Sequence, residues 1–242
     1  MINERSEDRT GNATHTHVTG VRETELKANV ERKATITGGE RMPFFSVIVP
    51  THNGAEHIRK ALDSVKRQRF DDYELIVICD DCEDNTEQIA MKYTPNVLSV
   101  DYHRDGLTRN KGLDAAAGDW ILFLDDDDWF MHEYVFSMLH EVAGKQGESI
   151  VNYSYVQKNK GYREQTPQNM FMACWCRCCK RELIGDTRFS DVTYGSDLQF
   201  FADLMRKKPD MVFWNTPMIY YNANDRSLNE YRQLMKEGWK HE

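Results

Sequence analysis

Residues 120–130, WILFLDDDDWF, decide how this chain is interpreted, because an apolar run ends in four adjacent carboxylates. Five consecutive apolar residues predict a strand that is buried on both faces of a sheet. Neighbouring carboxylates repel one another and resist losing water unless a cation pairs with them. The stretch therefore favours a cation site at the end of a buried strand, the alternative being a hydrated charged turn.

Upstream of this stretch, short apolar runs alternate with helical patterns. Strands are predicted at 43–50, 73–81, 96–102 and 119–124, and helices at 55–70, 85–93 and 106–118. Continuous apolar strands separated by amphipathic helices are typical of a mainly parallel sheet covered on both faces. We therefore expect an α/β, Rossmann-like sheet flanked by helices.

Downstream the alternation is lost. The patterns predict a helix at 132–143, a strand at 150–156, a polar loop at 157–168, a strand at 171–179, a helix at 198–205, and short strands at 211–214 and 218–222. We divide the chain into a polar and mobile tail (1–42), the alternating half (43–130) and a smaller α+β half of the same domain (131–242).

Composition limits the classes of function. The chain has 242 residues and a net charge of -8, which argues against a nucleic-acid-binding surface. No signal-peptide pattern or bilayer-length apolar run is found, so a cytoplasmic protein is expected, free or peripheral at a membrane. The six cysteines have no histidine at zinc-ligand spacing beside the 174–179 cluster, which favours reduced thiols over zinc.

Three polar clusters follow predicted strands, at 51–53, 80–81 and 125–128. Because ligands of open parallel sheets bind outside the carboxyl ends of the strands, these clusters should converge on one edge. Oxygen-only ligands suit Mg²⁺ or Mn²⁺, with substrate phosphates completing the coordination shell. The phosphate-binding patterns G-x-G-x-x-G and G-x-x-x-x-G-K-[ST] are both missing after the first strand.

Four segments together resemble the successive sequence blocks of family 2 glycosyltransferases with a GT-A fold. They are FFSVIVPTHNGAEHIRKALDSVKRQ, ELIVICDDCEDNT, GLTRNKGLDAAAGDWILFLDDDDW and RELIGDTRFSDVTYGSDLQF. The resemblance covers residues 44 to 228, in the order and spacing of the family. It implies an inverting transfer of a sugar from a nucleotide diphosphate donor, most often UDP, to an acceptor hydroxyl. The alternating half would then bind the nucleotide-sugar, and the second half would form an α+β acceptor lobe.

The resemblance also assigns roles by position. Asp197 falls where the family has its catalytic base, and Asp125 and Asp127 resemble the metal-binding DxD motif, with Mn²⁺ or Mg²⁺ as cofactor. The nucleotide-sugar site would include Pro50, Thr51, His52, Asn53, Asp80, Asp81, Arg109, Asn110, Asp125, Asp126 and Asp127. Candidate sugar or acceptor contacts are Asp128, Trp129 and Trp175.

The chain departs from the family at three places. His52 stands where an aromatic residue is usual, and the turn DDCEDNT is one residue shorter, which leaves the roles of Asp80 and Asp81 open. Ser196 precedes the expected base where glutamate is usual, so Asp197 could instead be a carboxylate that stabilises a helix N-terminus.

Two other functions remain open at this stage. One is a non-catalytic module that binds a sugar nucleotide or a glycan and descends from a glycosyltransferase. The other is a sugar-phosphate nucleotidyltransferase, although THNGAEH lacks the glycine-rich basic loop that would clamp a triphosphate. The acceptor is unidentified; lipid-linked sugars, polysaccharides and proteins are all compatible with the family, and the acidic charge disfavours nucleic acid without excluding it.

Overall fold

The computed structural model describes residues 42–143 and 147–223. Apart from Met42, the predicted tail lies outside the described residues, as do residues 224–242 of the second half. The described strands form one nine-stranded sheet in the order β3-β2-β1-β4-β8-β6-β9-β5, with β7 paired to β6. Strands from both halves of the chain thus share one sheet.

The first half builds the parallel part of the sheet. It consists of β1 (Phe45–Thr51), β2 (Tyr73–Asp80), β3 (Val97–Val100) and β4 (Trp120–Phe123). β1 is central and pairs in parallel with β2 on one side and with β4 on the other. The predicted alternation of strands and helices is confirmed: β1, β2 and β4 are largely buried between helical layers, whereas β3, at the edge of the sheet, is only partly buried.

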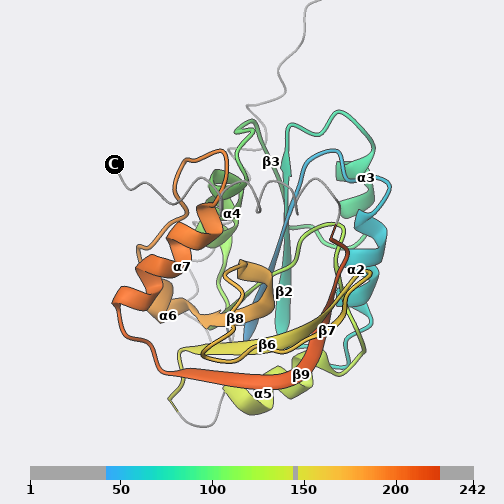
Figure 1. Ribbon diagram of the computed structural model, residues 1–242. Coiled ribbons are helices and arrows are strands. Elements are labelled where there is room, and N and C mark those ends of the chain that lie inside the picture. The colour runs from blue at the N-terminus through green and yellow to red at the C-terminus, as the bar shows by residue number, and fades with distance from the viewer. Residues whose placement is uncertain (1–41, 144–146, 224–242) are drawn as a thin grey trace, which may run out of the picture. The chain divides into compact units, whose positions relative to one another are not determined.

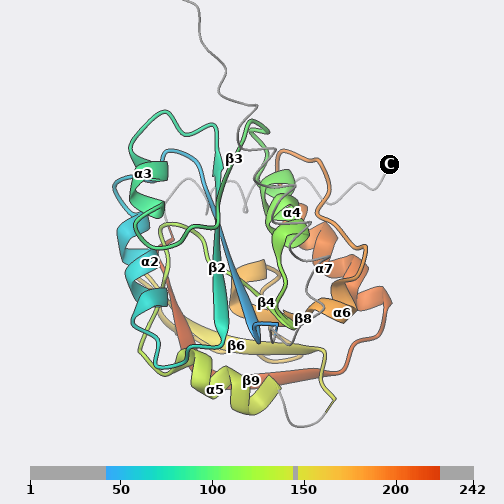
Figure 2. The ribbon, with the colours of Figure 1, turned by 180° about the vertical axis from the view of Figure 1, so that it is seen from behind.

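Helices cover both faces of these strands, as Figures 1 and 2 show. α2 (Ile58–Lys66) and α3 (Thr86–Ala90) lie on one side, and α4 (Asp105–Ala115) lies on the other. Alternate residues of β1 supply the two faces: Val47 and Val49 pack in the core beneath α2, whereas Ile48 packs in the core beneath α4. A buried side chain of this size stabilises the fold by about 1.5–3 kcal/mol.

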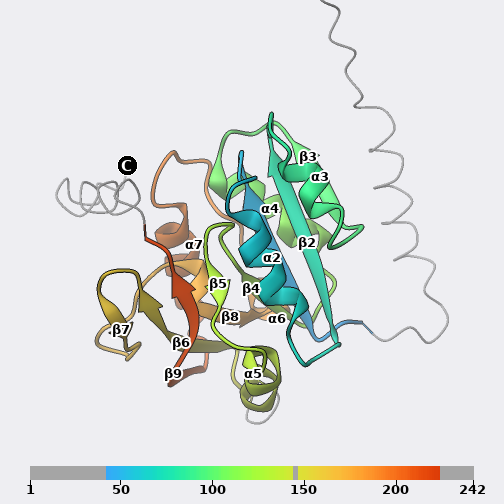
Figure 3. The ribbon, with the colours of Figure 1, turned by 90° about the vertical axis from the view of Figure 1, so that its right-hand side faces the viewer.

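The second half extends the sheet with mixed strand directions. Its elements are β5 (Trp129–Phe130), α5 (Val135–Ala143), β6 (Ile150–Gln157), β7 (Gly161–Arg163), a 3₁₀ turn (Cys174–Cys176), β8 (Arg177–Lys180), α6 (Arg181–Ile184), α7 (Ser196–Arg206) and β9 (Met211–Tyr221). β8 runs antiparallel to both β4 and β6, and β9 runs parallel to β6. Figure 3 shows β6, β7 and β9 grouped together at the end of the sheet away from β3.

Three predictions for this half were wrong in detail. The predicted loop at 157–168 contains β7, whose three residues are all exposed and therefore carry no apolar signal. Only the end of the predicted strand at 171–179 is extended, since Cys174–Cys176 forms the 3₁₀ turn. The two predicted strands at 211–214 and 218–222 are one strand, β9, whose register with β6 shifts near Pro217.

The shift in register explains why β9 continues through a proline. Proline cannot donate a ladder hydrogen bond, so inside a sheet it is confined to edges and irregular positions. Between Tyr153 and Tyr155 of β6, the partner in β9 moves from Trp214 to Ile219, so that the extra residues bulge out of the ladder. The strand then resumes and pairs antiparallel with β5.

Two further features concern the whole described region. None of its helices is both long enough and apolar enough to cross a bilayer. The six cysteines are free thiols, and the four between Cys174 and Cys179 are buried.

Candidate functional site

The predicted polar clusters meet at the carboxyl ends of β1, β2 and β4. The chain leaves β1 towards β2 and β3 on one side and returns to β4 on the other, so the strand order reverses between β1 and β4. Crevices at such reversal points are the usual ligand sites of open α/β sheets. Residues 51–53 and 125–128 therefore lie on either side of the expected crevice.

A direct contact joins β1 to the acidic run. The buried Thr51 hydroxyl donates a short hydrogen bond to the carboxylate of Asp126. Gly54 lies so close to these two groups that a Cβ atom at this position would overlap both the carboxylate and the hydroxyl. A larger residue at position 54 would therefore require the Asp126 carboxylate or the Thr51 hydroxyl to move.

His52 and Asn53 follow Thr51 at the carboxyl end of β1. Nδ1 of His52 lies 2.6 Å from the backbone oxygen of Asp80, so this nitrogen carries the proton and donates. Nε2 then accepts from the Asn53 side-chain amide at 3.1 Å. The side-chain oxygen of Asn53 accepts a hydrogen bond of 2.8 Å from the backbone N–H of Glu83, which connects the turn after β1 to the turn after β2. The hydrogen bond to the Asp80 carbonyl is the main reason that the pKa of His52 is raised.

Asp80 is buried and already fully hydrogen-bonded. Its Oδ1 accepts hydrogen bonds from the backbone N–H groups of Tyr102 and His103. Its Oδ2 accepts hydrogen bonds from the backbone N–H of Arg104 and from the Thr108 hydroxyl. Burial alone would raise the pKa of Asp80, but these four hydrogen bonds outweigh it and lower the pKa. Asp80 therefore organises the loop between β3 and α4, and its oxygens are not free to contact a nucleotide base.

Asp81 is the more exposed member of the pair. Its backbone is left-handed, with φ of 47°, and its carboxylate lies 3.5 Å from Nε2 of His103. The same nitrogen lies 2.8 Å from the carboxylate of Asp101. Asp81, Asp101 and His103 form an open group on the surface that is separate from the acidic run after β4. Of the two adjacent aspartates, Asp81 is the one whose carboxylate faces outward.

Arg109 connects the acidic run to the expected catalytic residue. Its Nη2 donates to Oδ1 of Asp125 at 2.9 Å, and its Nη1 lies 3.8 Å from Oδ1 of Asp197. Burial would lower the pKa of Arg109, but Cys174 and the surrounding carboxylates raise it well above its ordinary value. The guanidinium is therefore a fixed cation between two carboxylates that are 72 residues apart in the sequence.

Asp197 stands in the first turn of α7. Gly195 precedes the helix with a positive φ of 79°, which lets the chain turn into the helix beside α4. A carboxylate in the first turn is favoured by the helix dipole. In addition, Oδ2 of Asp197 accepts the backbone N–H of Cys174 at 3.3 Å. The local fold thus explains an aspartate at this position and also directs it into the same site as Asp125.

Burial raises the pKa of each carboxyl in the acidic run, and mutual repulsion adds to this effect. Burial is the largest cause for Asp125, whose pKa is raised despite its pairing with Arg109. The pKa values of Asp126 and Asp127 rise to about 6, and that of Asp128 rises well above its ordinary value. Repulsion from Asp125 contributes at all three. The run thus concentrates negative charge that the protein itself only partly neutralises.

The last strand completes the site. The backbone N–H of Asn222 donates to Oδ1 of Asp128 at 2.7 Å, while Oδ2 of Asp128 is buried without a hydrogen-bond partner in the described part of the chain. Burial raises the pKa of Tyr221, and the charges of Asp125, Asp128 and Asp127 raise it further, so its hydroxyl lies near the run. The sequence carries no pattern that points to Tyr221 as a residue of this site.

The two tryptophans predicted near the substrate are already packed against protein groups. Trp129 stacks on Tyr220 with ring centroids 4.1 Å apart, and Nζ of Lys60 lies 3.0 Å from its ring centroid. Trp175 is 3 % exposed and packs against Tyr221 at 4.5 Å. Little of the Trp175 surface therefore remains for contact with an acceptor.

Two other predicted residues hold the scaffold together. Asn110 makes a reciprocal pair with the backbone of Phe189, because its amide donates to the carbonyl and accepts the N–H, both at 2.8 Å. This pair ties α4 to the segment that leads into α7. Pro50 lies in β1 opposite Ile78 of β2, one residue before the Thr51 turn.

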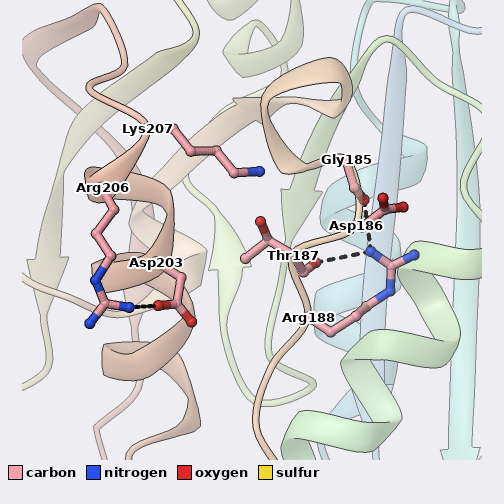
Figure 4. A pocket seen from close by; sticks show the side chains of 7 residues that line it. All are labelled: Gly185, Asp186, Thr187, Arg188, Asp203, Arg206 and Lys207. Atoms are coloured by element: carbon pink, nitrogen blue, oxygen red, sulfur yellow. Dashed lines mark hydrogen bonds and ion pairs between the residues drawn. The ribbon is translucent and has the colours of Figure 1, made fainter.

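A surface depression lies away from this edge, between α7 and the turn after α6 (Figure 4). It has a volume of about 770 Å³ and is lined by Gly185, Asp186, Thr187, Arg188, Asp203, Arg206 and Lys207. Its three basic side chains are already paired: Arg188 with Asp114, Arg206 with Asp203, and Lys207 with backbone carbonyl groups. The depression therefore offers no unpaired cation to an anionic ligand.

The acidic run fits a divalent metal ion. Its donors are carboxylate oxygens, which Mg²⁺ and Mn²⁺ prefer, and burial followed by mutual repulsion raises the pKa of Asp127 and Asp128, so a cation would favour their ionised form. Asp128 also has a buried oxygen without a hydrogen-bond partner in the described region. Asp125 and Asp127 remain the proposed ligands, and a bound ion would relieve the repulsion among the four carboxylates.

Comparison with known proteins agrees with this geometry. Residues 46–225 match the family described as Glycosyl transferase family 2. The chain belongs to this family. Among its curated relatives, it is 32 % identical over 217 residues to the putative glycosyltransferase EpsH of Bacillus subtilis, covering 77 % of this chain and 62 % of EpsH. The chain spans less than two thirds of the length of the first curated relatives it matches.

Solved structures identify the fold as GT-A, as expected. Staphylococcus aureus TarS (residues 1–349, in complex with UDP-GlcNAc) aligns with a TM-score of 0.66 at 21 % identity, covering 75 % of this chain and 59 % of TarS. Glucosyl-3-phosphoglycerate synthase from Mycobacterium tuberculosis, in complex with Mg²⁺ and UDP, aligns with a TM-score of 0.61 at 19 % identity. That alignment covers 88 % of this chain and 80 % of the synthase.

Proposed function

We propose that this family 2 chain is a metal-dependent, inverting glycosyltransferase that moves a sugar from a nucleotide diphosphate, with UDP favoured, to an acceptor hydroxyl. The observation that carries this proposal is the buried Arg109, which joins Asp125 of the acidic run to Asp197 of α7. One guanidinium group thereby holds two carboxylates in one site: Asp125, a proposed metal ligand, and Asp197, the candidate base. The UDP, UDP-GlcNAc and Mg²⁺ in the structural relatives support the choice of donor and cofactor.

Asp197 is proposed as the general base. Its Oδ1 is buried and faces Arg109, whereas Oδ2 accepts only the Cys174 N–H at the long distance of 3.3 Å. The side chain is 26 % exposed, so the exposed part of the carboxylate lies on the Oδ2 side. Oδ2 would accept the proton of the acceptor hydroxyl as that oxygen attacks the anomeric carbon from the face opposite the diphosphate.

The acidic run is proposed to lie on the other side of the anomeric carbon, where the diphosphate leaves. A Mg²⁺ or Mn²⁺ ion held there by Asp125 and Asp127 would neutralise the departing diphosphate. Asp126 and the Thr51 hydroxyl hold the β1 turn against the run, so that the diphosphate would enter at a fixed distance from the strand ends. Arg109 keeps Asp125 ionised and oriented in this arrangement.

The nucleoside is proposed to bind beside His52 and Asp81. The imidazole of His52 is held by the Asp80 carbonyl, and its exposed ring offers a face on which a base can stack. Asp81 can accept a hydrogen bond from a base or a ribose, since Asp80 is fully used inside the protein. The predicted nucleotide contact therefore narrows from Asp80 and Asp81 to Asp81.

Thermal unfolding in the presence of nucleotides tests the donor site. UDP, GDP, CDP and dTDP should each be added with and without Mn²⁺ to the wild type, to Asp127→Asn and to the exposed control Asp71→Asn. A ligand at about 100 times its dissociation constant stabilises the folded state by about 2.7 kcal/mol, or several degrees. The proposal expects one nucleotide to raise Tm only with metal and only when Asp127 is intact; no rise with any nucleotide would refute it.

Turnover separates an enzyme from a non-catalytic binding module. Release of UDP from UDP-sugars should be followed with a panel of glycan and lipid-linked acceptors. Asp197→Asn should lower the rate by about 10²- to 10⁴-fold, because a general base contributes this much, while the nucleotide still binds. Nucleotide binding that is accompanied by no transfer in the wild type would favour the binding module.

A further inference from the structure

A second arginine lies behind Asp197. Arg177, on β8, is 2 % exposed and is among the largest fully buried side chains of the protein. Its Nε donates to the side-chain carbonyl of Asn152 at 3.1 Å, and its Nη2 donates to the backbone oxygen of Phe171. The ring of Phe201, on α7, covers the guanidinium at 3.6 Å.

This guanidinium is buried without a direct ionic partner. Within residues 42–143 and 147–223, no carboxylate oxygen lies within 4.0 Å of its nitrogens. A buried charge is strongly unfavourable unless it is paired and hydrogen-bonded. The contacts with Asn152, Phe171 and Phe201 are neutral, so they leave the presence of a cation here unexplained.

A small cavity connects Arg177 to the candidate base. It is lined by both side chains together with Ile121, Phe123, Cys174, Cys179, Phe200 and Phe201. Nη1 of Arg177 and Oδ1 of Asp197 are both buried and lack hydrogen-bond partners in the described region, one being a donor and the other an acceptor. The cavity offers about 10 Å³ to the centre of a water molecule, which is near the minimum for a single water.

We propose that Arg177 is a positioning residue for Asp197 and acts across this cavity through one bridging water. The water would accept from Nη1 of Arg177 and donate to Oδ1 of Asp197, satisfying both groups. With Oδ1 held from behind, Oδ2 faces the acceptor side of the site. The catalytic consequence rests on the proposed function; the contact itself does not.

The kinetic test compares Arg177→Met, which keeps the volume and loses the charge, with Arg177→Lys and the control Arg181→Met. Arg181 lies four residues further along the chain and donates to the backbone oxygen of Gly118. We expect Arg177→Met to lower kcat at least about tenfold while the donor KM and the UDP affinity stay within about twofold, because a positioning group acts in the transition state. Arg177→Lys should recover part of kcat. A kcat equal to that of Arg181→Met would overturn the proposal, as would loss of kcat only in parallel with loss of donor binding.

A stability test examines the contact without requiring any turnover. Tm should be measured for Arg177→Met, Asp197→Asn and the double variant at one pH. Each single change leaves the other group without its partner, so the double variant should lose less Tm than the two single variants together. Arg177→Gln replaces Arg177→Met in the same cycle if the latter does not fold. Additive effects would refute the contact, whereas coupling in a protein that transfers no sugar would uphold the contact and refute only the proposed function.

Discussion

Replacing Asp127 with asparagine should stabilise the metal-free protein at pH 8. In the folded protein, burial and the neighbouring carboxylates raise the pKa of Asp127 from 3.8 to about 6. The folded state therefore binds more protons than the unfolded state between about pH 4 and pH 6, and its stability falls as pH rises through this window. Above pH 6 the full penalty applies.

The size of this penalty follows from the pKa. If the whole change acted on folding, it would amount to about 3 kcal/mol at pH 8. Asp127 is only partly buried, so solvent screening reduces the value to about 1–2 kcal/mol. Because Tm of a chain of this length moves by about 2–4 °C per kcal/mol, Asp127→Asn should raise Tm by about 2–8 °C at pH 8.

The assay is thermal unfolding in EDTA at pH 4, 6 and 8, with Asp71→Asn as the exposed control. The gain of Asp127→Asn should be small at pH 4, where the folded wild type keeps Asp127 protonated and the unfolded chain has it only partly ionised, and complete at pH 8. With Mn²⁺ and UDP at pH 8 the order should reverse, since only the wild type keeps both proposed ligands. A gain that is equal at pH 4 and pH 8, or no gain at all, would refute the electrostatic argument.

Three further variants test other parts of the site. Gly54→Ala should weaken UDP binding at least about tenfold, measured by calorimetry, because its Cβ would push the turn away from the Asp126 carboxylate and the Thr51 hydroxyl. Asp80→Asn should lower the free energy of unfolding, measured in urea, by about 2–3 kcal/mol, because the amide NH₂ group would face backbone N–H donors. The pKa of Asp80 is lowered in the folded protein, so the stability that its carboxylate contributes should be lost only as pH falls below about 4. Arg109→Lys keeps the charge but cannot pair both carboxylates, so kcat should fall at least about tenfold in a steady-state transfer assay; an unchanged kcat would argue against the bridge.

The alternating half of the fold was predictable because local pattern and final environment agree there. Runs such as residues 47–49 are apolar on both sides of the strand, and the structure buries both sides. β9 was split in the prediction because Pro217 normally ends a central strand, and the compensating shift in register involves β6, some 60 residues away. β5 has two residues and depends on β9 for its pairing, so no local pattern can predict it.

In the site, too, some features follow from local patterns and topology, whereas others depend on distant contacts. The convergence of residues 51–53 with the acidic run follows from parallel topology, and the structure brings Thr51 and Asp126 into contact. The difference between Asp80 and Asp81 could not be predicted, since it depends on which carboxylate meets the backbone N–H groups at 102–104. The buried Arg177 was missed for a similar reason: on a strand between cysteines, nothing local marks an arginine as buried.

The bond from the Asn222 N–H to Asp128 has a consequence for synthesis of the chain. Asp128 is synthesised 94 residues before this donor. A growing chain therefore carries the four aspartates before it has β9 or Asn222, the residue that contacts Asp128 in the folded protein. Until then, β6 also lacks its parallel neighbour, and its edge is open to pairing with other chains. A nascent chain released before residue 222 should therefore be prone to aggregation and should lack the contact that holds Asp128, so the acidic run can be completed only after β9 has been made.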